Sequence, residues 1–122
     1  MYSVVRYKTQ AGNCPLNDFL MDLLKNKKEI ELAQIQAYVQ MLQENGYRLP
    51  LMSNGYAKHL QGKLYELRPG NNRVIYFFLN SKDQYVLLHA FQKKSKKTPP
   101  QEITRAIDEM KDYEKRMTQN EK

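Results

Sequence analysis

Positively charged and aromatic side chains gather between residues 58 and 97. Such a set suits the cleavage of an RNA phosphodiester, because the crowded phosphorane needs charge stabilisation while protons move at the 2′-OH and the leaving oxygen. Arginine matches the first need, since its planar fork can grip two phosphate oxygens. The candidate residues are Lys58, His59, Arg68, Arg73, Tyr76, His89, Lys93, Lys94 and Lys97.

The charged residues also have a purely structural interpretation. Arg68 and Arg73 flank a turn, and Glu66 can pair with either of them as a surface ion pair. The four lysines within residues 93–97 are consistent with a solvated turn. Their mutual repulsion, however, favours a binding role.

The histidines and tyrosines have structural alternatives as well. His89 lies inside an apolar stretch, which is typical of a buried histidine with satisfied hydrogen bonds, whereas His59 lies in a polar loop. Tyr65, Tyr76 and Tyr85 are more typical of packing residues than of platforms for RNA bases.

Several familiar site types are missing from the sequence. It contains no glycine-rich phosphate loop and no CxxC, HExxH or GxSxG motif, so nucleotide hydrolysis, zinc chemistry and serine hydrolysis have no support. The one cysteine, Cys14, excludes a disulfide framework and a cysteine-based metal site. A net charge of +7 and a pI near 9.5 indicate an anionic partner: nucleic acid, an acidic protein or a membrane surface.

The length of 122 residues suits one domain with its own core and is too short for two. The first residues lead straight into a short strand, and no apolar run is long enough to span a bilayer. We therefore expect a single domain over residues 1–122 that is soluble and cytoplasmic and does not bind a membrane.

Three runs of aromatic and β-branched residues predict strands over residues 63–68, 73–79 and 84–91. The turn residues at 69–72 and 80–83 make the connections so short that neighbouring strands must be antiparallel. Neither of the first two strands has a wholly polar face, which predicts cover on both sides. The charged groups near the strand ends are expected to reach water.

Apolar residues at helical spacing predict a helix over residues 15–24, where a leading proline suits the first turn. A second helix is predicted over residues 29–45, with Gly46 as its stop. The short link predicts an antiparallel helical hairpin on one face of the sheet. Residues 2–7 predict a strand that joins the sheet, and residues 47–57 predict a loop.

A third helix is predicted after Thr98, which has the position of an N-cap, with a packing face from Ile103 to Tyr113. Residues 114–122 are mostly charged or polar and are expected to fray. The predicted fold class is α+β: an N-terminal strand and a helical hairpin packed on an antiparallel sheet of three to four strands, with a C-terminal helix.

A linked set of motifs runs through the second half of the chain. The motifs are Lys58-His59-Leu60, Leu64-Tyr65-Glu66-Leu67-Arg68-Pro69, Arg73-Val74-Ile75-Tyr76-Phe77-Phe78, Leu87-Leu88-His89-Ala90-Phe91-Gln92-Lys93-Lys94 and Lys97-Thr98-Pro99. With the opening strand and the helical hairpin, they resemble the phage-derived HigB-like branch of the RelE/ParE toxin superfamily. The linked run is specific, whereas any one motif alone is weak.

The resemblance implies a RelE-like fold and a toxin encoded beside a cognate antitoxin in a type II toxin–antitoxin system. In this branch it implies a ribosome-dependent mRNA endoribonuclease that cuts by 2′-OH attack without a metal or other cofactor. The implied partners are the ribosome, mRNA and an antitoxin that often carries a helix-turn-helix. Operator DNA is contacted only through the antitoxin complex.

The resemblance also implies roles for single residues. Arg68, Arg73 and Lys94 are expected to bind and stabilise the scissile phosphate. Glu66 stands where better-studied RelE members commonly have a lysine, and no tyrosine follows the basic cluster, so Glu66, His59 and a deprotonated lysine all stay open as the general base. The residues expected to hold flanking RNA or ribosomal RNA are Lys58, Lys63, Tyr76, Lys93, Lys96 and Lys97.

Two other functions stay open. A ParE-like relative would inhibit DNA gyrase by binding, without cutting anything. The grouping of Glu66, Arg68, Arg73 and the lysines favours the nuclease, because a pure binder has no need of it. A degenerate toxin would survive only as an antitoxin-binding corepressor.

Overall fold

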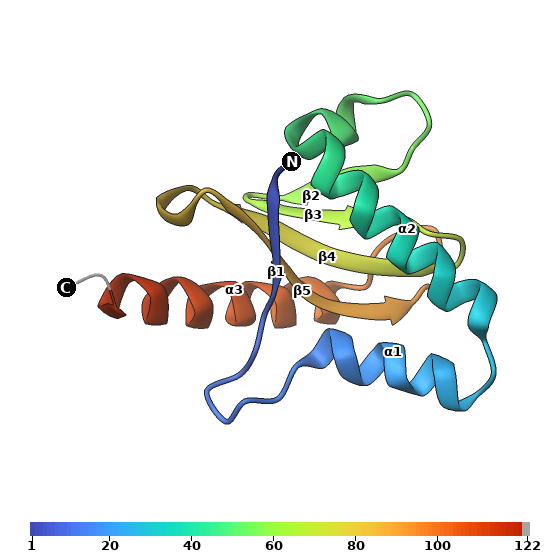
Figure 1. The fold of residues 1–122 in the computed structure, drawn as a ribbon, viewed down its shortest axis with the longest axis horizontal. Coiled ribbons are helices and arrows are strands. Elements are labelled where there is room, and N and C mark those ends of the chain that lie inside the picture. Colours follow the sequence, from blue (N-terminus) through green and yellow to red (C-terminus); the bar gives the residue numbers. More distant parts are fainter. Residues whose placement is uncertain (121–122) are drawn as a thin grey trace.

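A computed structural model of the chain describes residues 1–120, which form one five-stranded sheet with helices on both faces (Figure 1). The strands lie in the order β1-β5-β4-β3-β2. Their bounds are Ser3–Arg6 for β1, Ala57–Gln61 for β2, Leu64–Leu67 for β3, Asn72–Leu79 for β4 and Gln84–Gln92 for β5. The predicted α+β fold is confirmed, and the sheet has one strand more than the three or four expected.

The three strands predicted from the aromatic runs are β3, β4 and β5, and they pair antiparallel as expected. Strand β1 joins the other side of β5 in parallel, with Ser3 opposite Gln84. The fifth strand, β2, was not predicted: the loop expected over residues 47–57 ends at its first residue, and His59, which was expected in a polar loop, lies in β2 and pairs with β3. Strand β2 lies at the edge of the sheet, and the side chains of Lys58 and His59 are exposed. The strand therefore lacks the alternation of apolar and polar residues from which a strand is predicted.

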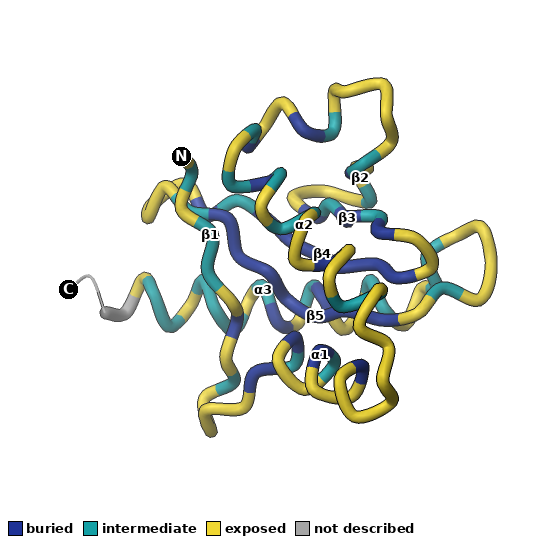
Figure 2. Tube along the Cα trace, turned by 45° about the vertical axis from the view of Figure 1, so that its right-hand side comes forward, coloured by how far each residue is buried: buried dark blue, intermediate teal, exposed yellow. Residues whose placement is uncertain are grey.

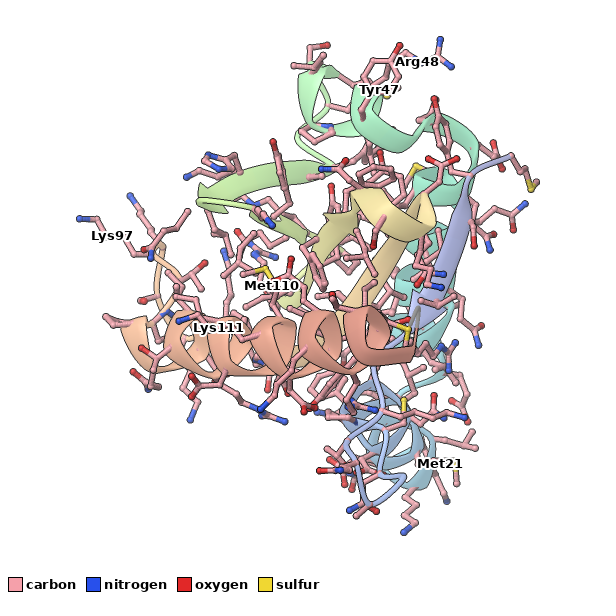
Figure 3. All side chains as sticks on the ribbon, turned by 90° about the vertical axis from the view of Figure 1, so that its left-hand side faces the viewer. Met21, Tyr47, Arg48, Lys97, Met110 and Lys111 are labelled. Atoms are coloured by element: carbon pink, nitrogen blue, oxygen red, sulfur yellow. The ribbon has the colours of Figure 1, made fainter. Side chains whose placement is uncertain are left out.

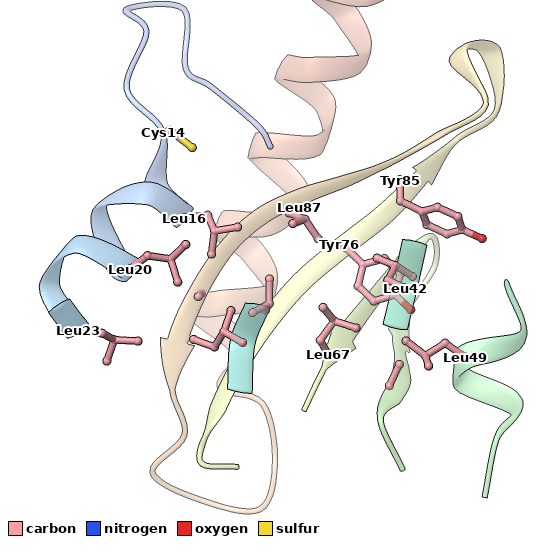
Figure 4. Close-up of a cluster of buried hydrophobic side chains, with 14 residues drawn as sticks. Cys14, Leu16, Leu20, Leu23, Leu42, Leu49, Leu67, Tyr76, Tyr85 and Leu87 are labelled. Carbon is pink, nitrogen blue, oxygen red and sulfur yellow. The ribbon is translucent and has the colours of Figure 1, made fainter. Parts of the chain in front are cut away.

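Helices α1 (Pro15–Lys25) and α2 (Glu29–Asn45) cover one face of the sheet, as predicted for the helical pair. Figure 4 shows the leucines of both helices pointing at side chains of β3, β4 and β5. The predicted loop that follows opens with a short 3-10 helix, η1 (Gly46–Leu51), and a second one, η2 (Asn80–Lys82), joins β4 to β5. We call the face of the sheet that α1 and α2 cover the α1/α2 face.

Helix α3 (Pro100–Asn120) lies across the opposite face, the α3 face, where Ala106 and its neighbours pack on Ile75 and Phe77. The fraying expected from residue 114 is wrong as far as Asn120, because helix α3 continues to that residue and Met117 packs on the core. The last part of that expectation, residues 121–122, lies outside the described residues. No helix within residues 1–120 is long and apolar enough to cross a membrane.

Strands β4 and β5 are therefore covered on both faces, and almost all of their side chains are buried (Figure 2). The expectation that the charged groups near the strand ends reach water is wrong for two of them. Glu66 is 3% exposed and Arg73 is 6% exposed. Their charges must be satisfied inside the protein.

Gly46 joins α2 to η1 with a φ of +53° and packs directly on the ring of Tyr2. A Cβ at this position would lie 2.6 Å from two ring carbons. Gly46→Ala is expected to lower the free energy of unfolding by about 2 kcal/mol or more, because a steric clash adds to backbone strain. Urea denaturation followed by circular dichroism measures the change.

Gly55→Ala is the matched control for this experiment. Gly55 has a φ of +71°, but a Cβ there would meet no atom within 4 Å. Its substitution is expected to cost about 1 kcal/mol from backbone strain alone. Equal losses in the two variants would contradict the close approach of Tyr2.

Candidate active site

Pairing between strands places a row of residues on the α3 face. Lys58 of β2 lies opposite Glu66 of β3, and Glu66 lies opposite Ile75 of β4. Ile75 in turn lies opposite His89 of β5. Arg73 shares this face because it precedes Ile75 by two positions. Paired side chains point to the same side of a sheet, so this row brings distant parts of the sequence together.

The carboxylate of Glu66 is the centre of the charged group. Its Oε2 lies 3.6 Å from Nε of Arg68 and 3.8 Å from Nε of Arg73. Its Oε1 accepts a hydrogen bond of 2.7 Å from the hydroxyl of Thr98. We call these four residues the Glu66 cluster. The two arginines expected to bind phosphate thus meet at one carboxylate.

The two arginines of the cluster differ in their surroundings. Arg73 is buried, and its Nη1 donates to the carbonyl oxygens of Gly70 at 2.8 Å and of Asn72 at 2.7 Å. Burial and the nearby charge of Arg68 lower the pKa of Arg73, while Glu66 acts in the opposite direction. Arg68 is partly exposed, and its Nε has no hydrogen-bond partner within the described part of the chain. Arg68 is therefore the arginine whose side chain is partly open to a ligand, although its Nε is buried beside Glu66.

The lysine-rich segment after β5 is fixed at both ends beside the Glu66 cluster. At its start, the backbone N–H of Lys93 donates to the carbonyl oxygen of Asn71 at 2.8 Å, and at its end Thr98 bonds to Glu66. Figure 3 shows Lys97 at the edge of the molecule, well away from Tyr47 and Arg48. The exposed lysines of this region are Lys94, Lys96 and Lys97 on the segment and Lys58 on β2.

Three residues expected at the site do not join this cluster. His59 follows Lys58 on β2, so the alternation of the strand turns it to the α1/α2 face. Tyr76 belongs to the core on that same face and is 2% exposed. The ammonium group of Lys63 pairs with Glu114 of α3 at 2.9 Å.

His89 reaches α3 through a β-bulge. The register between β4 and β5 shifts after Ile75, so both Leu88 and His89 face α3. The ring Nδ1 lies 2.5 Å from Oε1 of Glu109, and Nε2 lies 2.9 Å from Oε1 of Glu102. A neutral imidazole has one N–H, so two such bonds require an imidazolium or a protonated carboxyl group. This contact fastens α3 to the sheet.

The sequence interpretation missed these partners. Thr98 was expected to be an N-cap, but its hydroxyl donates to the carboxylate of Glu66, and α3 begins at Pro100. Glu102 and Glu109 are two helical turns apart, so their spacing already places both on one side of the helix and could have revealed them. Within residues 1–120, no three His, Cys, Asp or Glu side chains are arranged to hold a metal ion.

Replacing His89 tests its role as a fastener. His89→Gln is expected to lower the free energy of unfolding by about 3 kcal/mol or more, because the buried carboxylate of Glu109 loses its main partner. Urea denaturation measures the loss. His59→Gln is the control: its ring is exposed, so its substitution should cost less than about 1 kcal/mol. A similar small loss in both variants would contradict this assignment.

The family and the fold follow from comparison with known proteins. Residues 21–111 match the family described as phage-derived protein Gp49-like. No curated protein matches the chain.

Two solved structures share the fold. One is a chain of the archaeal RelE–RelB complex from Pyrococcus horikoshii OT3, with a TM-score of 0.54 and 20% identity over 76% of this chain and 96% of that chain. The other is a chain of the toxin–antitoxin complex RelBE2 from Mycobacterium tuberculosis, with a TM-score of 0.51 and 18% identity over 75% of this chain and 98% of that chain. The chain has a RelE-like fold and belongs to the Gp49-like family of phage-derived proteins.

Proposed function

We propose that this protein is the toxin of a type II toxin–antitoxin system and that it cleaves mRNA on the ribosome. The observation that carries the proposal is the meeting of Arg68 and Arg73 at Glu66, beside a segment of exposed lysines. The similar structures are complexes of RelE with RelB, which supports a cognate antitoxin as the partner. The net charge of +7 supports contact with RNA.

In this proposal the scissile phosphate is bound by Arg68 and Lys94. The side chain of Arg68 is partly exposed, and Lys94 is exposed on the lysine-rich segment that is fixed beside the Glu66 cluster. Arg73 is buried and donates to backbone carbonyls, so it holds the turn. Its positive charge stabilises the bound phosphate without direct contact. The lysines that contact flanking RNA or ribosomal RNA are Lys58, Lys93, Lys96 and Lys97.

Glu66 is the proposed general base. A hydroxyl already lies 2.7 Å from its Oε1, because Thr98 donates to that oxygen. A substrate 2′-OH that replaces Thr98 gives its proton to Glu66, and the 2′-oxygen attacks phosphorus. The bond from phosphorus to the 5′-oxygen breaks, and Lys94 donates a proton to that oxygen. The products are a 2′,3′-cyclic phosphate and a 5′-hydroxyl.

A toxin that acts by binding alone, as a ParE-like gyrase inhibitor, is the second candidate. One observation favours it: Glu66 is 3% exposed and its charge is balanced within the protein, as in a structural ion-pair network. Inhibition in a supercoiling assay with DNA gyrase identifies this function. A degenerate corepressor has the same geometry, but it causes no growth arrest and binds DNA only with its partner.

Arg68→Ala is expected to slow message cleavage about a hundredfold to a thousandfold, because the transition state loses one charged donor. Induction in cells, followed by mapping of mRNA ends, measures the effect, and purified ribosomes with mRNA test the dependence on the ribosome. Lys63→Ala is the control and should cleave normally, since Lys63 pairs with Glu114 away from the cluster. Intact message with the wild type, or full cleavage by Arg68→Ala, would contradict the proposal.

Glu66→Gln separates the carboxylate's charge from its shape. The amide oxygen can still accept from Thr98, but it is a poor base, so cleavage should fall at least about a hundredfold. Thr98→Val removes the competing hydroxyl and leaves the carboxylate in place, so it should reduce cleavage far less than Glu66→Gln does. Circular dichroism establishes that both variants fold. An active Glu66→Gln would assign the base to another group.

A further inference from the structure

A pocket of about 320 Å³ lies on the α1/α2 face, at the end of β4 opposite to Arg73. It is separate from the Glu66 cluster, because alternation places Tyr76 and Arg73 on opposite sides of β4. Its walls are mainly aromatic. The rings are those of Tyr2, Tyr47, Tyr65, Tyr76, Phe78 and Tyr85.

These rings contact one another mostly edge to face. The centroid of Tyr2 lies 6.4 Å from that of Tyr47 and 5.9 Å from that of Tyr85, with the ring planes nearly perpendicular in both pairs. Tyr85 in turn lies 6.0 Å from Tyr76. The face of an aromatic ring carries partial negative charge. Because the rings of the pocket are turned in different directions, a bound ligand can meet such faces on more than one side.

The only charged side chain that lines this pocket, among the residues the structure describes, is Asp83. A neighbouring hollow shares Tyr2 and Asp83 and adds Glu44 and Arg48. The guanidinium of Arg48 lies 5.8 Å from the ring centroid of Tyr47, so an arginine of the chain itself already uses the outer edge of this aromatic group. The charged group that lines the pocket is thus an exposed carboxylate, whereas the chain as a whole carries a net charge of +7.

A second observation points to a ligand. The hydroxyl of Tyr76 is buried and has no hydrogen-bond partner within residues 1–120, although its ring lines the pocket. Burial, and to a lesser degree Tyr85 and Tyr65, raise the pKa of Tyr76, so the group is a neutral hydroxyl that can accept a bond. Buried polar groups normally have partners, so the wall of the pocket at Tyr76 is not fully satisfied by the chain itself.

We propose that this aromatic pocket binds an arginine side chain of a partner protein. A guanidinium stacks on tyrosine faces, and its several N–H groups can donate to the Asp83 carboxylate at the pocket. An anionic nucleotide fits less well, because its phosphate would lie near Asp83 with no lysine or arginine lining the pocket. The proposal is independent of mRNA cleavage, since it uses none of the residues of the Glu66 cluster.

The direct test is a titration of the whole chain with the peptide acetyl-Ala-Arg-Ala-amide. The chain has nine tyrosines and no tryptophan, so tyrosine fluorescence reports on the pocket, and amide NMR shifts locate the binding. The same peptide with citrulline, which is neutral and has nearly the same shape, is the control. We expect saturable binding of the arginine peptide and at least about tenfold weaker binding of the citrulline peptide.

Two variants locate the binding. Asp83 has a φ of +51°, which asparagine tolerates well, so Asp83→Asn should fold normally and weaken arginine binding about tenfold. Tyr76→Phe keeps the ring that lines the pocket and removes the unpartnered hydroxyl, so arginine binding should be retained while the urea midpoint of the free protein stays equal or rises. Tyr38→Phe alters a tyrosine that does not line the pocket and should change neither quantity.

The remaining outcomes overturn the proposal in different ways. Equal binding of the arginine and citrulline peptides, or unchanged affinity in Asp83→Asn, would show that the attraction between the guanidinium and Asp83 does not contribute to binding. Stronger binding of uridine 5′-monophosphate would make the pocket a nucleobase site. Binding of methylguanidinium as tight as that of the peptide would identify a free small cation, and not a partner protein, as the occupant.

Discussion

The burial of β4 and β5 on both faces is the constraint on which the rest of the structure depends. With α1 and α2 on one side and α3 on the other, a polar side chain in these strands has no water nearby and must bond within the protein. Asn72 donates to Glu31 of α2 at 2.9 Å, Arg73 donates to backbone carbonyls, and His89 contacts two glutamates of α3. Asn72 and His89 thus fasten the sheet to α2 and α3, and Arg73 fastens the turn that precedes β4.

The same bonds position the candidate active site. The contact of His89 with α3 fixes the helix whose start carries the lysine-rich segment, and Thr98 at the end of that segment bonds to Glu66. Arg73 holds the turn between β3 and β4, which is where Arg68 emerges. The partly exposed Arg68 and the exposed lysines are therefore held at one edge of the sheet by groups that are themselves buried.

Strand alternation separates two kinds of chemistry on opposite faces. Along β4, Arg73 and Ile75 face α3, while Tyr76 and Phe78 face the α1/α2 side and its aromatic pocket. One face therefore presents cations at its edge, and the other presents tyrosine rings and the single carboxylate of Asp83. The proposed RNA contact at the first surface therefore leaves the second free for the proposed partner protein.

The sequence by itself determined the elements with strong local patterns: the antiparallel β3, β4 and β5, the helices α1 and α2, and the start of a third helix. Helical spacing, two-residue alternation and turn residues act between near neighbours, so they can be recognised without coordinates. The linked motifs from Lys58 to Pro99, with the opening strand and the helical pair, also sufficed to suggest the RelE-like fold, and the structure brings Arg68 and Arg73 to Glu66.

Only the tertiary structure decided the rest. The edge strand β2 has no apolar pattern of its own and exists because β3 offers it hydrogen bonds. The bulge that turns His89 toward Glu102 and Glu109, the bond from Thr98 to Glu66, and the separation of His59, Lys63 and Tyr76 from the cluster all depend on which face each side chain takes once the sheet is assembled. The pairing of an edge strand, a shift of register and the placement of helices depend on packing between distant segments, so a pattern within one segment does not determine them.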